Sequence, residues 1–103
     1  MAAVTGVKVY KGELAGNTQF LEITGTLTTS VDTITLTSAV HGISPSAVLT
    51  VVADKIETGM AAGFAELQTT VSGFVITVSS FNAAGAVATT FGAIRLLVKV
   101  VEP

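Results

Sequence analysis

Hydrophobic and polar residues alternate with a period of two along several short stretches of the chain. The clearest stretch is Phe74–Ser79, in which every second residue is a large apolar one. A second stretch has Val31, Ile34 and Leu36 as its apolar side, with one irregular step at Asp32. Because successive side chains of a strand point to opposite faces, this period predicts strands with one buried face.

Turn-forming residues (Gly, Asn, Pro and Ser) separate seven such stretches, and Ser72–Gly73 predicts a tight hairpin between two of them. No stretch convincingly predicts a helix. The chain is therefore expected to form one domain over residues 1–103, an antiparallel β-sandwich of about seven strands with a short N-terminal arm; a jelly roll or a small barrel is the alternative. The predicted strands are Val4–Tyr10, Thr18–Leu27, Val31–Thr37, Ala47–Ala53, Phe64–Thr70, Phe74–Ser80 and Ala93–Val101.

The last predicted strand has one purely apolar side and one mixed side. Ile94, Leu96, Val98 and Val100 belong to the first side, which we expect in the core, whereas the other side carries two cations. Phenylalanines at three positions within predicted strands are also expected in the core, and these are Phe20, Phe64 and Phe74.

Two stretches do not follow the alternation. Asp54–Gly63 is mixed and contains glycine, which predicts a long loop or a short edge strand. Asn82–Gly92 is rich in small residues and carries no charge, and Phe81 and Phe91 bracket most of it. It is either a flexible loop or a segment that lies against another surface, and its two phenylalanines either contact a partner or fold back onto the sandwich.

Composition narrows the classes of function. Half of the 103 residues are hydrophobic, only 12% are charged against the usual 25% or so, and the formal net charge is −2. Without clustered Lys and Arg, a nucleic-acid partner is not expected. Cysteine is absent, which excludes disulfides and thiolate metal sites. No apolar run reaches the 20 or so residues that a spanning helix needs, so we expect no membrane partner, no signal peptide and no anchor.

Candidate catalytic chemistry is sparse. His41 is the only imidazole and lies in a predicted turn, where a histidine usually bonds to nearby backbone. Asp54 and Glu57 are the closest pair of carboxylates, with Glu66 further on, and nothing in their spacing points to a hydrolase or to a calcium loop. We therefore predict a non-enzymatic protein with no catalytic, cofactor or metal residues. A small hydrolase or lyase that uses His41 with a carboxylate is an alternative hypothesis.

The low charge and high apolar content predict a subunit of an assembly. A chain of this size leaves much of its surface exposed, and single soluble domains rarely leave large apolar patches uncovered. We expect a homo-oligomer, in which symmetry covers such patches and the sheet edges. The candidate interface residues lie in the N-terminal arm, around the uncharged loop and on the mixed side of the last strand: Val4, Thr5, Phe81, Phe91, Arg95 and Lys99.

Four stretches resemble small β-rich virion proteins of tailed bacteriophages, among them head decoration (cement) proteins. The resemblance is one of texture, since these proteins are also free of cysteine and rich in Thr, Val, Ala and Gly, and it covers most of the chain. The stretches are Ile34–Ile43, Ala47–Val52, Val75–Gly85 and Ile94–Val101.

This resemblance implies a capsid decoration protein that binds the outside of the head and stabilises it against internal pressure. Its partner would be the major capsid protein, it would form a homo-oligomer with a trimer favoured, and it would reach the virion after synthesis in the host cytoplasm. A phage tail or fibre module that binds a host-surface glycan, through the loop Asp54–Gly63, is the alternative.

Overall fold

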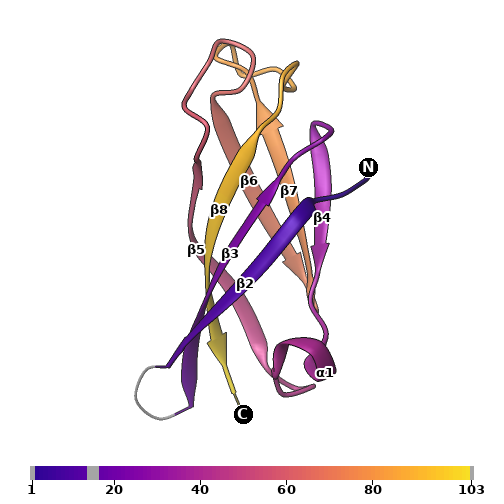
Figure 1. The fold of residues 1–103 in the computed structure, drawn as a ribbon, viewed down its shortest axis with the longest axis vertical. Helices are drawn as coiled ribbons and strands as arrows, with labels where there is room; N and C mark the ends of the chain where they lie inside the picture. Colours follow the sequence, from indigo (N-terminus) through magenta and orange to yellow (C-terminus); the bar gives the residue numbers. More distant parts are fainter. Residues whose placement is uncertain (1, 14–16, 103) are drawn as a thin grey trace.

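The computed structural model describes residues 2–13 and 17–102, which form eight strands and one short helix (Figure 1). The elements are β1 Ala2–Ala3, β2 Thr5–Glu13, β3 Thr18–Thr26, β4 Val31–Thr35, α1 Ser38–His41, β5 Val48–Ile56, β6 Glu66–Ser72, β7 Val75–Phe81 and β8 Ala93–Val101. The predicted all-β fold is confirmed.

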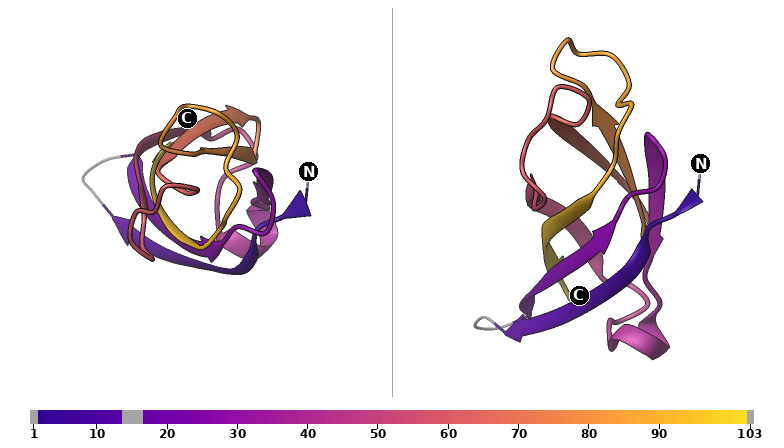
Figure 2. Two further views of the ribbon diagram at one scale, coloured as in Figure 1. Left: turned by 90° about the horizontal axis from the view of Figure 1, so that it is seen from above. Right: turned by 45° about the horizontal axis from the view of Figure 1, so that its top comes forward.

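Two four-stranded sheets pack face to face as a sandwich. One has the order β1-β4-β7-β6 and the other β2-β3-β8-β5, and all neighbours are antiparallel except β1 and β4. The hairpins β2–β3 and β6–β7 stay within a sheet, whereas the other five connections pass from one sheet to the other: β1–β2, β3–β4, β4–β5, β5–β6 and β7–β8. Seen along the long axis, the strands surround a single interior (Figure 2).

The interior is filled by apolar side chains from both sheets, as the alternation predicts. The apolar side of β8, which pairs with β3 and β5, is at most 1% exposed at each position. The side chains of this core with the lowest exposure include Leu21, Ile23, Ile76, Val78, Ile94, Leu96, Val98 and Val100. The tight hairpin at Ser72–Gly73 is also present, because Gly73 adopts φ +58°, which favours glycine.

The irregular step in β4 has a structural cause. Asp32, Ile34 and Leu36 face the interior, so the expectation that Val31 is on the apolar side is wrong: Val31 is only partly buried on the opposite side. Asp32 is fully buried. The backbone N–H groups of Thr28 and Thr29 donate to its carboxylate at 2.7 and 3.3 Å, and these bonds offset the cost of removing the carboxylate from water. The aspartate thus closes the turn between β3 and β4 from inside the core.

The phenylalanines and the short helix differ from expectation. Phe20 is not in the core: its neighbour Leu21 takes the inner side of β3, which turns Phe20 to the outer side. Phe64 is buried but precedes β6, and Phe74 lies in the hairpin turn, packed partly against the core. The helix α1 was not predicted, since it is a single turn, capped by the Thr37 side chain.

The protein is fully compact as a single chain. Its accessible surface is 5387 Å², and a folded monomer of 10.4 kDa is expected to expose about 5,400 Å². Its principal extents are 42 × 23 × 20 Å. Any assembly would therefore join subunits that are already folded.

Candidate functional site

The six interface residues predicted from the sequence lie in three separate places. Val4 and Thr5 lie where the chain passes from β1 to β2, at one side of the sandwich. Phe81 and Phe91 lie near the end formed by the β5–β6 and β7–β8 loops. Arg95 and Lys99 lie on the outer side of β8. The structure therefore brings these residues together in pairs only.

The predicted N-terminal arm is part of the fold over its described residues. Ala2 and Ala3 pair with β4, and the Val4 N–H donates to the Thr33 carbonyl at 2.9 Å. Val4 is only 6% exposed and belongs to the core, so its side chain offers nothing to a partner in this conformation. Thr5 is exposed but donates through its hydroxyl to the Thr26 carbonyl at 3.2 Å.

Two loops form an uncharged end of the molecule, which we call the tip: residues 58–65 and 82–92. The loops are held together by backbone hydrogen bonds, from Ala83 N–H to the Ala62 carbonyl at 2.9 Å and from Thr89 N–H to the Gly63 carbonyl at 3.0 Å. Gly63 allows this close approach, because a Cβ there would lie 2.6 Å from the Thr89 hydroxyl.

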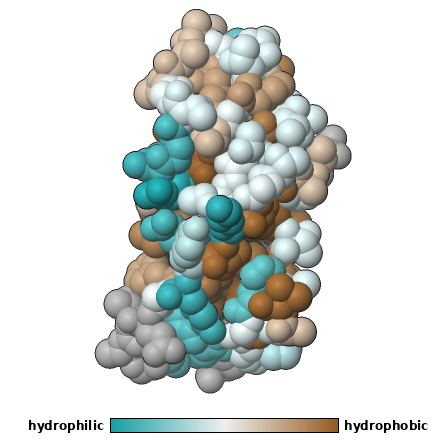
Figure 3. Space-filling view, viewed as in Figure 1, coloured by the Kyte–Doolittle hydropathy of each residue, from teal (hydrophilic) through white to brown (hydrophobic). Residues whose placement is uncertain are grey.

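The tip exposes apolar side chains despite this internal order. Met60, Val87 and Phe91 are 75%, 60% and 38% exposed, whereas Phe64 is buried beneath them and Phe81 is half-buried. In Figure 3 the upper end of the molecule is largely white to tan, and strongly hydrophilic side chains gather lower down. The tip is therefore a braced, apolar and uncharged surface.

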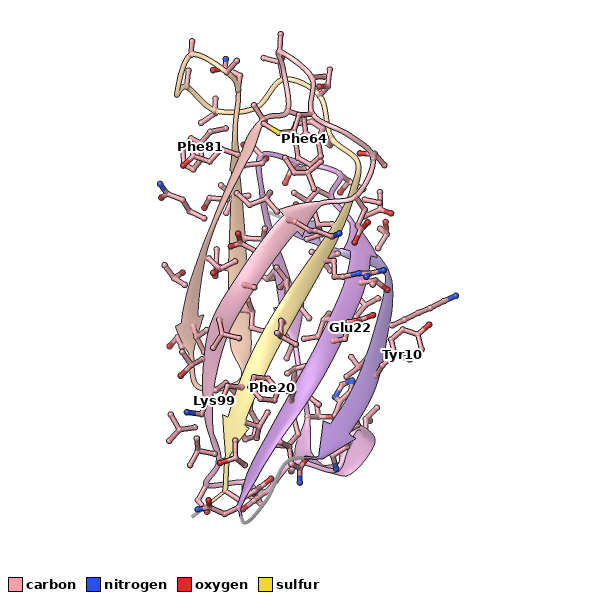
Figure 4. The ribbon with its side chains drawn as sticks, turned by 90° about the vertical axis from the view of Figure 1, so that its left-hand side faces the viewer. Tyr10, Phe20, Glu22, Phe64, Phe81 and Lys99 are labelled. Atoms are coloured by element: carbon pink, nitrogen blue, oxygen red, sulfur yellow. The ribbon has the colours of Figure 1, made fainter. Side chains whose placement is uncertain are left out.

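The outer side of sheet β2-β3-β8-β5 has the opposite character, and we call it the charged face. Cross-strand pairing aligns Tyr10 with Glu22, Glu22 with Leu97, and Phe20 with Lys99. Figure 4 looks onto this sheet, with Tyr10 and Glu22 on adjacent strands and Phe20 and Lys99 lower down. The side chains that define the charged face are Lys8, Tyr10, Phe20, Glu22, Lys55, Glu57, Arg95, Leu97 and Lys99.

Ion pairs hold part of the charged face in place. The Arg95 Nε lies 2.7 Å from Glu57 Oε1 and 3.9 Å from Glu22 Oε1, and the Lys55 Nζ lies 3.6 Å from Glu57 Oε1. Arg95 is thus engaged within its own chain, and the predicted cross-subunit role of Arg95 and Lys99 stays a prediction. Among the described residues, Lys8 and Lys99 form no ion pair.

The titratable residues considered for catalysis are scattered. His41 takes part in capping α1, since its Nδ1 accepts from the Thr37 N–H at 2.9 Å. Burial raises the pKa of Asp54, and a hydrogen bond from Thr69 opposes this effect. Within residues 2–13 and 17–102, no three His, Asp or Glu side chains lie close enough to hold a metal ion.

The charged face contains residues that sequence reasoning did not select, namely Tyr10, Glu22 and Leu97. These three lie 12 to 87 positions apart in the chain. Only strand register brings them side by side, and a single sequence does not supply register between distant strands. The exposed position of Tyr10 on a strand was the one available signal.

Comparisons with protein-family models, with curated proteins and with solved structures found no match to this chain. In the part of the chain that the structure describes, no helix is long and apolar enough to span a bilayer.

Proposed function

We propose that this protein is a non-enzymatic structural subunit of a virus particle, a decoration protein that binds the outer surface of a tailed-phage head and stabilises it. The tip carries the proposal. It combines apolar exposure at Met60, Val87 and Phe91 with the absence of any charged residue in both of its loops.

The tip has the properties of the centre of a protein–protein interface. Such centres are depleted of charged residues and enriched in aromatic residues and Met. The hydrogen bonds between the two loops order the tip before it meets a partner, and Asn82 adds to this order by accepting from the N–H groups of Ala84 and Ala86 at 3.0 Å. Ordering in advance lowers the entropy cost of binding.

The proposed partner is the major capsid protein, with the decoration protein as a homo-oligomer, most simply a trimer around a local threefold axis. The free strand edges are compatible with this arrangement, since copies can cover one another's edges. The compact surface of the single chain favours assembly of complete subunits over exchange of segments. The surface area buried between the proteins would supply the stabilisation of the head, and no covalent bond would be made or broken.

Cosedimentation with purified phage heads that lack this protein tests the proposal. We expect the wild-type chain to pellet with heads, and the double variant Met60→Ser/Val87→Ser to lose at least ten-fold in affinity, since two exposed anchors become polar. Val40→Ser/Val48→Ser is the matched control, because these residues are 78% and 63% exposed but lie outside the tip.

The two double variants separate the tip from general surface hydrophobicity. If the control pair weakens head binding as much as the tip pair, or if the wild-type chain stays in the supernatant, the decoration role through the tip is wrong. Light scattering on the unbound protein measures its oligomeric state, and a strict monomer at high concentration contradicts the proposed trimer.

A further inference from the structure

Three of the depressions in the molecular surface lie side by side on the charged face. The first, of about 340 Å³, is lined by Lys8, Thr24 and Arg95 among others. The second, of about 110 Å³, is lined by Ala53, Asp54, Lys55, Arg95 and Leu97. The third, of about 290 Å³, is lined by Tyr10, Phe20, Glu22 and Leu97 among others. The first and second depressions share Arg95 and the second and third share Leu97, so the three are neighbours on the sheet, and we call the row that they form the furrow.

Two glycines of β2 leave room for the furrow. Gly12 is the cross-strand partner of Phe20, so that no side chain stands beside Phe20 on that side. At the other end, Gly6 lines the depression around Lys8, and a Cβ at Gly6 would meet only open space. The furrow is therefore built into a rigid sheet, which keeps its lining residues in fixed positions.

The lining combines a flat aromatic surface with donors and acceptors. Tyr10 is 55% exposed although it lies in the middle of a strand, and Leu97 beside Glu22 is 37% exposed. Glu22 accepts hydrogen bonds, Arg95 donates them, and the hydroxyls of Tyr10 and Thr24 do both. A pyranose ring needs this combination, since its C–H faces stack on an aromatic ring while its hydroxyls bond to charged groups at the rim.

The charge on the face favours an acidic ligand. The charged face and the lining of the furrow together hold all five cationic residues of the chain against three carboxylates, those of Glu22, Asp54 and Glu57. This side of the sheet therefore has a formal charge of +2 on a chain of −2. Lys8 and Lys99 form no ion pair among the described residues. Lys8 lines the first depression, and Lys99 is the cross-strand partner of Phe20, which lines the third. A carboxylate-bearing ligand would pair with both.

We propose that the charged face binds an acidic polysaccharide, an extended chain of uronate-type sugars, along this furrow. Tyr10 stacks on one ring, Glu22 and Arg95 bond to ring hydroxyls, and Lys8 and Lys99 pair with sugar carboxylates. The inference goes beyond the role in the capsid and does not depend on it, because the tip takes no part.

Other extended ligands fit the face less well. An extended peptide binds by adding to a strand edge, where free backbone groups give most of the affinity, and the furrow crosses a sheet whose inner strands β3 and β8 are already paired on both sides. A nucleic acid requires dense phosphate neutralisation, whereas each of the three depressions has a carboxylate in its lining, from Glu57, Asp54 and Glu22 in turn.

Affinity electrophoresis of the full chain through gels that contain alginate, a polymer of uronates, or dextran, a neutral polymer, tests the proposal. We expect retardation by alginate only, and weaker retardation as salt is raised. Tyr10→Ala should lower the affinity at least ten-fold, and circular dichroism should show the same fold, because Tyr10 is largely exposed.

A matched pair of double variants separates the furrow from net charge. Lys8→Gln/Lys99→Gln and Thr70→Glu/Ser72→Glu each make the chain more negative by two charges, and the second pair lies exposed on β6 in the opposite sheet. We expect the first to abolish retardation by alginate and the second to leave most of it. No retardation of the wild type, equal retardation by dextran, or equal losses in both variants overturns the proposal.

Discussion

The carboxylate of Asp32 accepts the backbone N–H of Thr28 at 2.7 Å and is completely enclosed by the protein. The N–H and hydroxyl of Thr29 also donate to this carboxylate. Burial by itself would raise the pKa of Asp32, but the hydrogen bonds from Thr28 and Thr29 outweigh it and lower the pKa below its ordinary value. The ionised form is therefore the one that the fold prefers.

We expect Asp32→Asn to lower the free energy of unfolding by about 1 to 3 kcal/mol at pH 7, because an amide replaces a charged acceptor among several donors. The sign of the pH dependence follows from the lowered pKa. The wild-type advantage is present above the unfolded-state pKa and is lost as pH falls through the folded-state value. Urea unfolding of the wild type and of Asp32→Asn at pH 7 and near pH 2 measures the difference in the free energy of unfolding and its pH dependence. If the variant is less stable than the wild type by the same amount at both pH values, this account is wrong.

Asp54 should behave in the opposite way. Burial raises its pKa, the hydrogen bond from Thr69 being the weaker effect, so the fold favours the protonated form. Stability from this group is present at low pH and lost as pH rises through the folded-state pKa. We expect Asp54→Asn to raise the free energy of unfolding at pH 7 by less than about 1 kcal/mol, since the group is partly exposed, and to change nothing near pH 3. A loss of stability at pH 7 would contradict the direction.

The sequence predicted the fold where local alternation decides it. Seven of the eight strands were found, and β1 was missed because it was taken for part of an arm. The last strand, β8, was placed with its apolar side inward, because four apolar residues at a period of two leave no other arrangement. The alternation misassigned β4, since a carboxylate at an inner position is rare and only the donors of Thr28 and Thr29 make it tolerable. The α1 turn is too short to show a period.

Of the two surfaces, the sequence indicates the tip and not the furrow. The tip is recognisable in the sequence, because its uncharged residues are contiguous in two stretches. The furrow is not, because Tyr10, Glu22 and Leu97 become neighbours only through the register of three strands. Val4 was expected at an interface because it is near a terminus, yet its pairing next to β4 places it in the core.

The contact between Gly25 and Val4 provides a test of how β1 is held. A Cβ at Gly25 would lie 2.5 Å from Val4 Cγ1 and 3.3 Å from the Thr5 carbonyl. We expect Gly25→Ala to lower the free energy of unfolding by about 1 to 3 kcal/mol, because β1 and β2 must shift. Val4→Ala should lower the free energy of unfolding less in the Gly25→Ala variant than in the wild type, because the smaller side chain at position 4 relieves the clash with the added Cβ at position 25. Strict additivity in chemical denaturation would show that the two residues do not press on each other.

Gly12→Ala is the control for that experiment. The nearest atom to a Cβ at this position is the Phe20 carbonyl oxygen at 3.9 Å, an ordinary contact, and the backbone of Gly12 is not in the left-handed region. Its stability should change by less than about 0.5 kcal/mol, the usual range for exposed positions without special contacts. If Gly12→Ala lowers the free energy of unfolding as much as Gly25→Ala, then a methyl group added at either glycine disturbs the sheet, and the contact with Val4 is not the cause.

Glu57 connects stability and binding on the charged face. Its carboxylate lies 2.7 Å from Arg95 and 3.6 Å from Lys55, and all three side chains are partly exposed. Glu57→Gln should therefore lower the free energy of unfolding by less than about 1 kcal/mol, as for other exposed ion pairs. The same change releases Arg95 and raises the formal charge of the face from +2 to +3, so we expect tighter binding of alginate, by two-fold or more at low salt.

Glu66→Gln separates this local effect from a change in net charge. Glu66 lies exposed on β6 in the opposite sheet, and its substitution alters the total charge by the same amount. Retardation in alginate gels should increase for Glu57→Gln and stay at the wild-type level for Glu66→Gln. Weaker binding by Glu57→Gln would contradict this prediction. It would mean that Glu57 holds the Arg95 guanidinium in the position that binds sugar, and that losing this orientation outweighs the gain in positive charge.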